Sequence, residues 1–336
     1  MNVIGATTGR RAAAAVSGAA LFLTGLLAGP VLHAQDVFPS RPIRVVTPFP
    51  PGSSNDVIPR LVAARLSERL GQSVIVDNRS GGGGMVGTET VVRATPDGYT
   101  LLVGTSSGMV MNVGLYRKLP FDVERDLVPV VLLTRTNLAM LAYPGAPGST
   151  LQEFVAFARA NPGKLSYGSG GNGSISHIVP ENLKRILGVD ILHVPYRGNG
   201  PAMVDLVAGR IHIVFGGLLG AAQLVENRSL KVYAVGGTQR STAYPAIPTF
   251  LELGVKDLDP YTWNGLMAPA GTPPAVLERL NRETNAVLRE PELRQAIEKR
   301  GSDVIQDSTL KSTTAFVVAE RARWVPLVRS LNLSID

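Results

Sequence analysis

The sequence predicts an α/β fold, and three observations support this class. Short apolar runs of strand length recur along the chain, and stretches with helical periodicity separate many of them. Most of these runs lack the strict alternation of a strand with one wet face, which is typical of strands covered by helices on both sides. Glycine-rich turns follow two of the strands. The chain has 336 residues, enough for a leader and two domains.

The expected elements follow one another without repeats, low-complexity tracts or long linkers. Strands are expected at 43–47, 74–77, 101–104, 130–133, 138–143, 165–168, 191–195, 211–215 and 232–235. Amphipathic helices are expected at 57–70, 151–160, 178–187, 274–288 and 292–299. The first helix should begin with Asp56 as its N-cap, because the ring of Pro59 would clash with the carbonyl of a helical Asn55.

Residues 1–34 have the anatomy of a signal peptide. Arg10 and Arg11 precede an apolar run over 12–29, and the small residue Ala34 suits the position before a cleavage site. The run approaches the length of a membrane span, but its many small residues, with Ser17 and Thr24, make it only weakly hydrophobic. We therefore expect a cleaved leader and not an uncleaved membrane anchor.

Composition excludes several kinds of chemistry. The chain has no cysteine, so disulfides, thiol chemistry and lipidation at a cysteine are impossible. Loss of the leader, which holds two arginines and no acid, lowers the formal net charge from +7 to +5. Only 6% of the residues are aromatic, and no basic stripe accompanies them, which argues against nucleic-acid binding. The spacing of His177, His193 and His212 puts no two on one helix face, so no metal site is expected.

Two glycine-rich turns between a strand and a helix carry the main functional signal. They cover residues 45–56, VVTPFPPGSSND, and residues 165–177, LSYGSGGNGSISH. Such a turn directs backbone amides toward one place beside a helix N-terminus, which is how proteins hold anions. An exported chain with two such turns predicts an extracytoplasmic anion-binding receptor.

Two motifs point to enzymes instead. Residues 168–173 match G-x-G-x-x-G, but the acid that would hold a ribose should close the next strand, and Asp190 precedes that strand. Residues 104–108 match G-x-S-x-G, so an exported α/β serine hydrolase with Ser106 as nucleophile is the alternative. Residues 109–116 contain Asn112 and Gly114 and do not predict the helix that should follow, and no histidine occupies a late loop position.

Several sequence blocks together resemble the substrate-binding receptors of tripartite tricarboxylate transporters, also called Bug receptors. In family order from about Phe38 to near the C-terminus they are PFPPGSSND, DNRSGGGGMVG, PDGYTLLVGT, YGSGGNGSISH, VPYRG with DLVAGRI, LKVYAVGGTQR with IPTFLELG, and WNGLMAPAGTPP. The resemblance implies a two-lobed periplasmic-binding-protein-like clamshell, each lobe a sheet flanked by helices. It also implies a periplasmic, monomeric protein without cofactor or catalysis, which captures a small carboxylate for membrane transporter subunits or a signalling partner.

The resemblance and the strand order together predict the domain bounds. Lobe 1 is expected at 35–136 plus 262–336, after the signal peptide at 1–34, and lobe 2 at 137–261. Two crossovers, near Thr136 and Tyr261, would then join the lobes.

The same resemblance implies the ligand contacts. In the first loop Gly52, Ser53, Ser54 and Asn55 match the positions that hold one carboxylate, with Ser53 in place of the usual glycine, while Asp56 fits a cap better than a contact. The second loop supplies Ser169, Gly170, Asn172, Gly173 and Ser174. His177 follows, and packing within the loop is its simpler role, although Pro180 departs from the family pattern and leaves its orientation open.

Further candidates lie at or near the carboxyl ends of strands, where open α/β sheets bind ligands. They are Phe49, Thr105, Ser106, Tyr196, Arg197, Gly216 and Trp263. Arg197 is the cation that would meet a distal carboxylate, and Trp263 fits either a cleft wall or the core. Gly216 and Gly217 offer no acid for a substrate amine, which favours a simple carboxylate over an amino acid.

The leader generates the first prediction. The exported protein should begin near Gln35, because Ala34 suits the cleavage position. N-terminal sequencing of exported protein checks this, and recovery of an intact Met1 leader in the membrane fraction would contradict it.

Overall fold

The computed structural model describes residues 38–333, so the expected signal peptide at 1–34 lies outside the described range. Its strands are β1 Ile43–Thr47, β2 Val74–Asn78, β3 Thr100–Thr105, β4 Leu127–Ala142, β5 Leu165–Ser169, β6 Ile191–Pro195, β7 Ile213–Gly217, β8 Lys231–Val235, β9 Tyr261–Pro269 and β10 Asp303–Val304. Its helices are α1 Ser54–Leu70, α2 Met85–Val92, α3 Asn112–Leu115, α4 Val123–Asp126, α5 Leu151–Ala160, α6 Ile175–Leu187, α7 Asn199–Val207, α8 Ala222–Glu226, α9 Pro274–Leu288, α10 Pro291–Glu298 and α11 Leu310–Ser330. Short turns are η1 Gly82–Gly84, the π-helical η2 Ser107–Met111 and η3 Leu219–Ala221.

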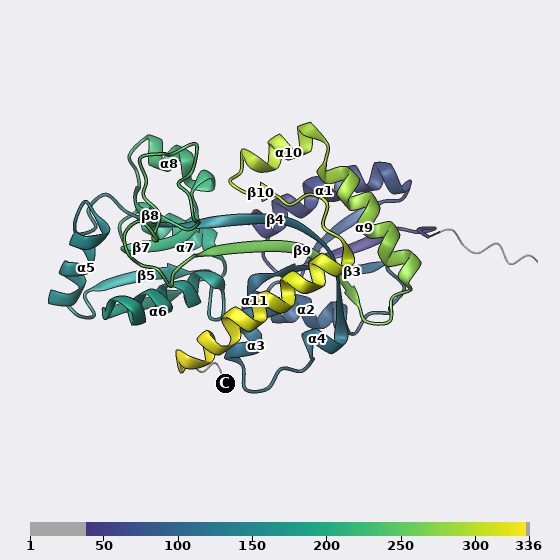
Figure 1. The fold of residues 1–336 in the computed structure, drawn as a ribbon, viewed down its shortest axis with the longest axis horizontal. Coiled ribbons are helices and arrows are strands. Elements are labelled where there is room, and N and C mark those ends of the chain that lie inside the picture. The colour runs from purple at the N-terminus through teal and green to yellow at the C-terminus, as the bar shows by residue number, and fades with distance from the viewer. Residues whose placement is uncertain (1–37, 334–336) are drawn as a thin grey trace, which may run out of the picture. The chain divides into compact units, whose positions relative to one another are not determined.

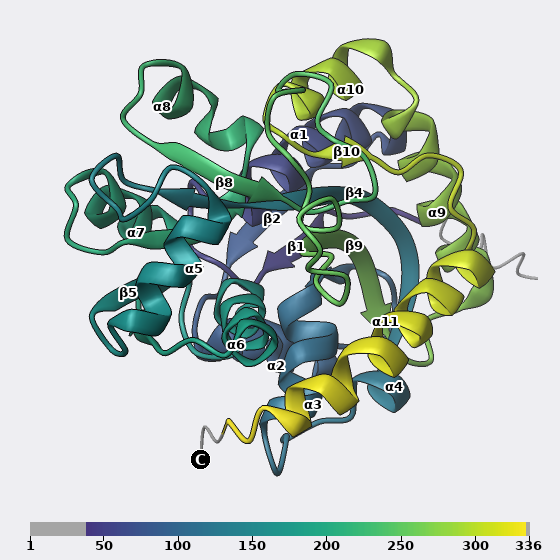
Figure 2. The same ribbon diagram turned by 60° about the vertical axis from the view of Figure 1, so that its left-hand side comes forward.

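The strands form one mixed sheet in the order β2-β1-β3-β9-β4-β7-β5-β6, with β8 and β10 paired to β4. Two long strands, β4 and β9, connect its two ends (Figure 1). We call β1 to β3 with their helices the first lobe, and β5 to β7 with theirs the second. Helices α5 to α8 accompany the second lobe, whereas α1, α9 and α10 lie at the other end (Figures 1 and 2). The predicted α/β class and two-lobed clamshell are confirmed.

Strand β4 changes partners in its middle. Its residues Leu127 to Asn137 pair with β9, and from Leu138 onward it pairs with β7 and β8. Strand β9 begins at Tyr261, which pairs with Asn137. The bounds of the two lobes remain a prediction, but this change of partner falls where the first crossover was expected.

The sequence misplaced several elements. Residues 130–133 and 138–143 were expected as separate strands, but the polar stretch between them pairs with β9 and continues a single strand, β4. Residues 109–115 are helical, as the end of η2 followed by α3, although no helix was expected over 109–116. Strands β9 and β10 and helices α2, α7 and α11 were not predicted.

Both loop helices begin earlier than expected and contain a proline. Helix α1 starts at Ser54 and not after an N-cap at Asp56, so Asn55 is helical. Pro59 has no N–H for the carbonyl of Asn55, and the Thr47 hydroxyl donates to that carbonyl instead, at 2.6 Å. Helix α6 starts at Ile175, and Pro180 likewise lies in its second turn. The proline in each helix is therefore accommodated without delaying the helix start.

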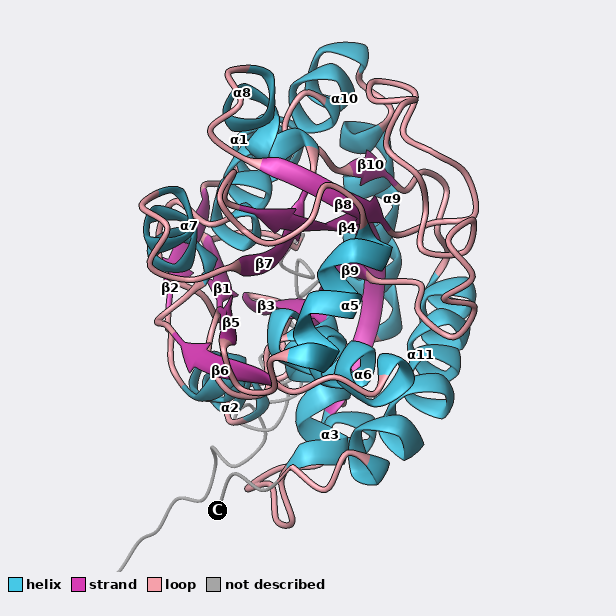
Figure 3. Ribbon diagram, turned by 90° about the vertical axis from the view of Figure 1, so that its left-hand side faces the viewer, coloured by secondary structure: helices cyan, strands magenta, loops and turns pink. Residues whose placement is uncertain are grey.

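A buried glutamate ties the last helix to β9. Glu320 of α11 is 5% exposed, and its side-chain oxygens accept hydrogen bonds from the Tyr261 hydroxyl and from the Trp263 indole Nε1 at 3.0 Å. Trp263 is fully buried and meets Phe316 of α11 edge-on, with ring centroids 5.4 Å apart. Helix α11 thus fixes the start of β9, where the chain returns from the second lobe (Figure 3). None of the helices in the described range is long and apolar enough to cross a membrane.

Removing this acceptor generates the second prediction. Glu320→Ala should lower the free energy of unfolding by about 2–4 kcal/mol, because two buried donors lose their partner and a cavity is left. Guanidinium unfolding monitored by tryptophan fluorescence measures the change. Glu292→Ala, at a surface ion pair with Arg65, is the control and should cost less than about 1 kcal/mol. Equal effects of the two changes would contradict the role of Glu320.

Candidate functional site

Asp56 organises the first loop, between β1 and α1. The carboxylate of Asp56 is 3% exposed and accepts hydrogen bonds from the Gly52 amide at 2.9 Å, Arg60 Nε at 2.9 Å and Asn78 Nδ2 at 2.8 Å. Burial alone would raise the pKa of Asp56, but these hydrogen bonds outweigh burial and hold the pKa below its ordinary value. Asn78 also donates to the Phe49 carbonyl at 2.9 Å. Asp56 is therefore not the N-cap that the sequence predicted, but it anchors the loop from inside the helix.

These contacts determine which amides of the first loop are still available. The Gly52 amide is engaged by Asp56, whereas the amides of Ser53 and Asn55 donate to no other residue of the described range. The Oδ1 atom of Asn55 is buried and also lacks a partner within that range. The loop thus offers two amides beside the N-terminus of α1, where anions are favoured.

The second loop, between β5 and α6, is held largely by its own groups. The Gly170 amide donates to Ser176 Oγ at 2.9 Å, and the Gly173 amide donates to His177 Nδ1 at 3.2 Å. Ser174 donates both its amide and its hydroxyl to the Gly171 carbonyl. Most of the amides from Gly170 to Ser174 are therefore already paired within the loop. In this loop and the first turn of α6, the amides of Asn172 and Ser176 have no acceptor among the described residues.

A column of three rings supports the second loop from the sheet side. His193 of β6 stacks between Tyr167 and His177, with ring centroids 4.8 and 4.2 Å apart. Ser169 Oγ lies 2.6 Å from His193 Nε2 and accepts the Gly171 amide at 3.1 Å. His177 accepts the Gly173 amide at its Nδ1 atom. Both histidines therefore hold the loop, His177 directly and His193 through Ser169, and the sequence analysis did not name His193 for this role.

Burial keeps both imidazoles neutral. It lowers the pKa of His177 to about 4, with a smaller contribution from the Lys184 ammonium. It also lowers the pKa of His193 to about 4, and here the neighbouring His177 adds to the effect.

The remaining predicted contacts differ in their surroundings. Thr105 and Ser106 are buried at the end of β3, and Thr105 Oγ1 accepts the Gly108 amide at 3.3 Å. The Tyr196 hydroxyl donates to Asp205, and its amide donates to the Ser169 carbonyl, so Tyr196 braces the second loop. Arg197 is exposed.

Two predicted residues serve the sheet and the core. Gly216 is buried in β7 opposite Ala139, within the pairing of β7 with β4. Trp263 occupies the core, one of the two roles that the sequence left open, and its amide donates to Ser106 Oγ at 3.1 Å.

The surroundings of Ser106 contradict a hydrolase. Its hydroxyl lies 3.2 Å from Thr262 Oγ1 and accepts the Trp263 amide. The three histidines of the described range hydrogen-bond elsewhere, since His212 binds Ser166 while His177 and His193 hold the second loop. A serine nucleophile needs a histidine within hydrogen-bond reach. The alternative function is therefore not supported.

The structure brings the loops of the two lobes together. A Cβ placed on Gly198, after β6, would lie 3.2 Å from Pro50 of the first loop. A Cβ on Gly83 of η1 would lie 2.8 Å from the Asn172 carbonyl oxygen of the second loop. The glycine run at 81–84 is therefore part of this meeting place, which sequence reasoning did not foresee, because the contact depends on how the lobes meet.

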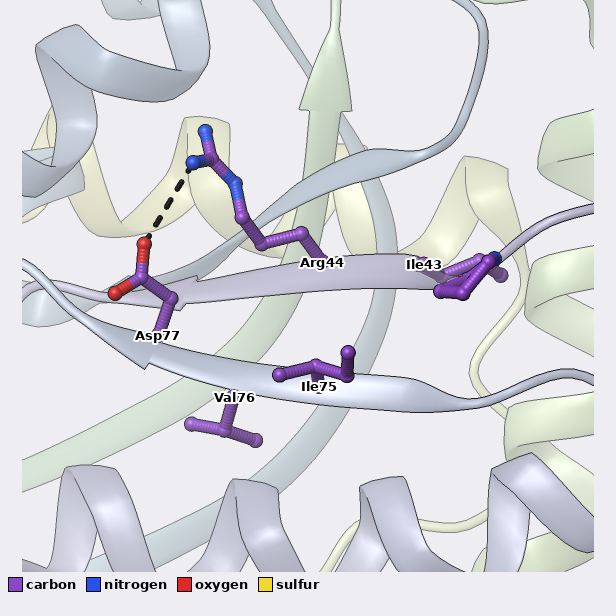
Figure 4. A pocket seen from close by; sticks show the side chains of 6 residues that line it. Ile43, Arg44, Ile75, Val76 and Asp77 are labelled. Atoms are coloured by element: carbon purple, nitrogen blue, oxygen red, sulfur yellow. Dashed lines mark ion pairs between the residues drawn. The ribbon is translucent and has the colours of Figure 1, made fainter.

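Two surface hollows lie away from these loops. One, of about 290 Å³, is lined by residues of the β1–β2 edge, among them Ile75, which is 54% exposed, and the ion pair Arg44–Asp77 at 3.6 Å (Figure 4). The other, of about 560 Å³, lies around residues 113–125 and Arg329. Neither is lined by a predicted ligand contact, so hollow size does not identify the site.

Comparisons with known proteins agree with the fold. Residues 58–333 match the tripartite tricarboxylate transporter family receptor. BugT of Bordetella pertussis is 34% identical over 313 residues, which cover 93% of this chain and 95% of BugT. The structure of MatC from Rhodopseudomonas palustris with bound malate is 31% identical, with a TM-score of 0.82, and the match covers 87% of this chain and 100% of MatC. An adipate-bound R. palustris protein is 31% identical, with a TM-score of 0.83, over 88% of this chain and 99% of that one.

The fold and the family match define a solute-binding receptor of the periplasmic binding protein type, not an enzyme. The chain belongs to the receptor family of the tripartite tricarboxylate transporters, as its sequence blocks predict. Membership of this family implies a periplasmic location.

The histidine pair generates the third prediction. Between about pH 6.5 and pH 4 the unfolded chain binds protons at these histidines that the folded protein does not, so the free energy of unfolding should fall as the pH is lowered. Each histidine contributes up to about 1.4 kcal/mol per pH unit. His177→Phe keeps the ring but cannot titrate, so it should be less stable at pH 7 and show a shallower dependence on pH.

Guanidinium unfolding from pH 7 to pH 4.5, in buffers without carboxylates, measures both slopes. A wild-type slope that His177→Phe leaves unchanged would show that His177 is not buried as a neutral acceptor.

Proposed function

We propose that the protein captures a small carboxylate between its first and second loops and presents it to membrane subunits of a tripartite transporter. The observation that carries the proposal is the pair of loops. Each follows the carboxyl end of a strand, opens a helix, and has two amides without an acceptor among residues 38–333. A carboxylate has two oxygens that accept hydrogen bonds from such amides.

The loops suit a carboxylate without a buried cation. In the first loop the amides of Ser53 and Asn55 are the donors, and in the second those of Asn172 and Ser176. Thr105 accepts the Gly108 amide, and within the described range its hydroxyl hydrogen has no acceptor, so we assign it as a further donor at the end of β3. Charge-assisted bonds of this kind are about twice as strong as neutral ones, which makes a set of amides and hydroxyls sufficient.

Relatives support the ligand class. MatC with malate and the R. palustris protein with adipate both hold dicarboxylates. In this chain Arg197 is exposed after β6 and is the residue we assign to a second carboxylate of the ligand. The end of β7 is formed by Gly216 and Gly217, which provide no acidic side chain to bind an amine. The proposed ligand is therefore a di- or tricarboxylate without an amino group.

The remaining sequence expectations belong to the same proposal. The protein acts as a monomer after cleavage of its signal peptide, and its lobes are 35–136 with 262–336 and 137–261. Asn137 and Leu138, where β4 changes partners, would form one crossover of the hinge.

Removal of a single hydroxyl tests the site and is the fourth prediction. Thr105→Val keeps the side-chain shape and should weaken carboxylate binding about ten- to a hundredfold, because a hydrogen bond to a charged group is worth about 1.5–3 kcal/mol. Isothermal calorimetry with malate, adipate, citrate and benzoate gives the affinities.

Thr284→Val is the matched control, since Thr284 is fully buried in α9 and its hydroxyl has no partner among the described residues. It should leave the affinities unchanged. If none of the carboxylates binds the wild-type protein, the proposed ligand class is wrong. If one binds and Thr105→Val has no effect, Thr105 is not a contact.

A further inference from the structure

Two motifs of the first lobe supply no predicted ligand contact. One is the run of four glycines, Gly81 to Gly84, which all have positive φ, between 54° and 141°. The other is the stretch after β3, in which Ser107 opens the π-helical turn η2. π-helical turns often occur at functional positions. Both motifs meet the second loop.

The hydroxyl of Ser107 reaches across to the second lobe. Ser107 is 3% exposed, and its Oγ accepts the amide of Ile175 at 3.2 Å. Ile175 is the first residue of α6, so its amide has no acceptor within the helix. A first-lobe side chain thus fills a position at the N-terminus of the helix that opens after the second ligand loop.

The glycine run lies against the second loop. At Gly83 an added Cβ would lie 2.8 Å from the carbonyl oxygen of Asn172, which is closer than a Cβ atom approaches an oxygen in folded proteins. Asn112, which follows η2 directly and is fully buried, donates from Nδ2 to the Gly83 carbonyl at 3.3 Å. Asn112 therefore connects the glycine run to the turn that carries Ser107.

From these contacts we propose that Ser107 and Gly83 form a latch that holds the second loop against the first lobe and so couples ligand capture to closure. Ser107 and Gly83 are positioning residues, because they act on Ile175 and Asn172 and not on the ligand. The proposal rests on the proposed function, since it assigns these residues to the same site. It assigns a role to the run of glycines and to Ser107, which follows the serine of the G-x-S-x-G sequence.

A matched pair of glycine variants tests the latch. Gly83→Ala should weaken binding of malate or adipate at least about tenfold, because the new methyl group separates the second loop from η1. Gly82→Ala is the control. Gly82 has nearly the same φ, 54° against 60°, but an added Cβ meets Met85 at 3.3 Å and not the second loop. Both substitutions therefore strain the backbone to a similar degree, and only Gly83→Ala places a methyl group against the second loop.

Ser107→Ala tests the hydrogen bond by a second measurement. It should weaken binding about three- to tenfold with little change in melting temperature. In hydrogen–deuterium exchange without added carboxylate, the peptide that contains Ile175 should exchange about three- to tenfold faster than in the wild-type protein.

The outcomes separate the two proposals. If neither malate nor adipate binds the wild-type protein, the proposed ligand class fails, while the exchange experiment still tests the latch. If Ser107→Ala leaves exchange at Ile175 unchanged, or if Gly82→Ala and Gly83→Ala behave alike in exchange across the second loop, there is no latch.

Discussion

The structure depends on one strand that belongs to two sets of pairings. Strand β4 pairs with β9 up to Asn137 and with β7 and β8 from Leu138, so a single stretch of backbone connects both lobes. A strand extends about 3.3 Å per residue. Strand β4 therefore sets where the carboxyl ends of β1 and β3 lie relative to that of β5 when the loops meet. Because both ligand loops grow from those strand ends, their meeting place follows from the sheet.

The two loops are held in their conformations by different kinds of hydrogen bond. In the first, a buried carboxylate at Asp56 receives the Gly52 amide and fixes the turn. In the second, neutral imidazoles and hydroxyls perform this task, with His177 receiving the Gly173 amide. Each loop uses most of its polar groups to hold its own conformation and leaves two amides over. Preorganised donors of this kind do not have to be ordered when a ligand arrives, which lowers the entropic cost of binding.

The sequence predicted features that depend on neighbouring residues, and it missed those that depend on contacts between distant segments. Strands such as β1 and β6 matched their apolar runs to the residue, and the glycine turns were placed correctly, because a run of apolar residues and a turn residue act over short distances. Strand β9 contains Asn264 and Gly265 and does not look like a strand until β3 and β4 lie on either side of it. The roles of His193, Ser107 and Gly83 arise only when distant segments pack together. The effect of Pro59 was misjudged, because the hydroxyl of Thr47 in β1 donates to the Asn55 carbonyl the hydrogen bond that Pro59 cannot donate.

The tie between α11 and β9 has a consequence for the order in which the chain folds. Glu320, which holds Tyr261 and Trp263, lies close to the C-terminal end of the chain. A chain that emerges from its N-terminal end exposes β1, β3 and β4 long before β9 can enter between β3 and β4. The first lobe is then an incomplete sheet with an open gap, whereas most of the second lobe is contiguous and able to assemble earlier. Formation of the ligand-binding protein is thus a late step that waits for the last helix.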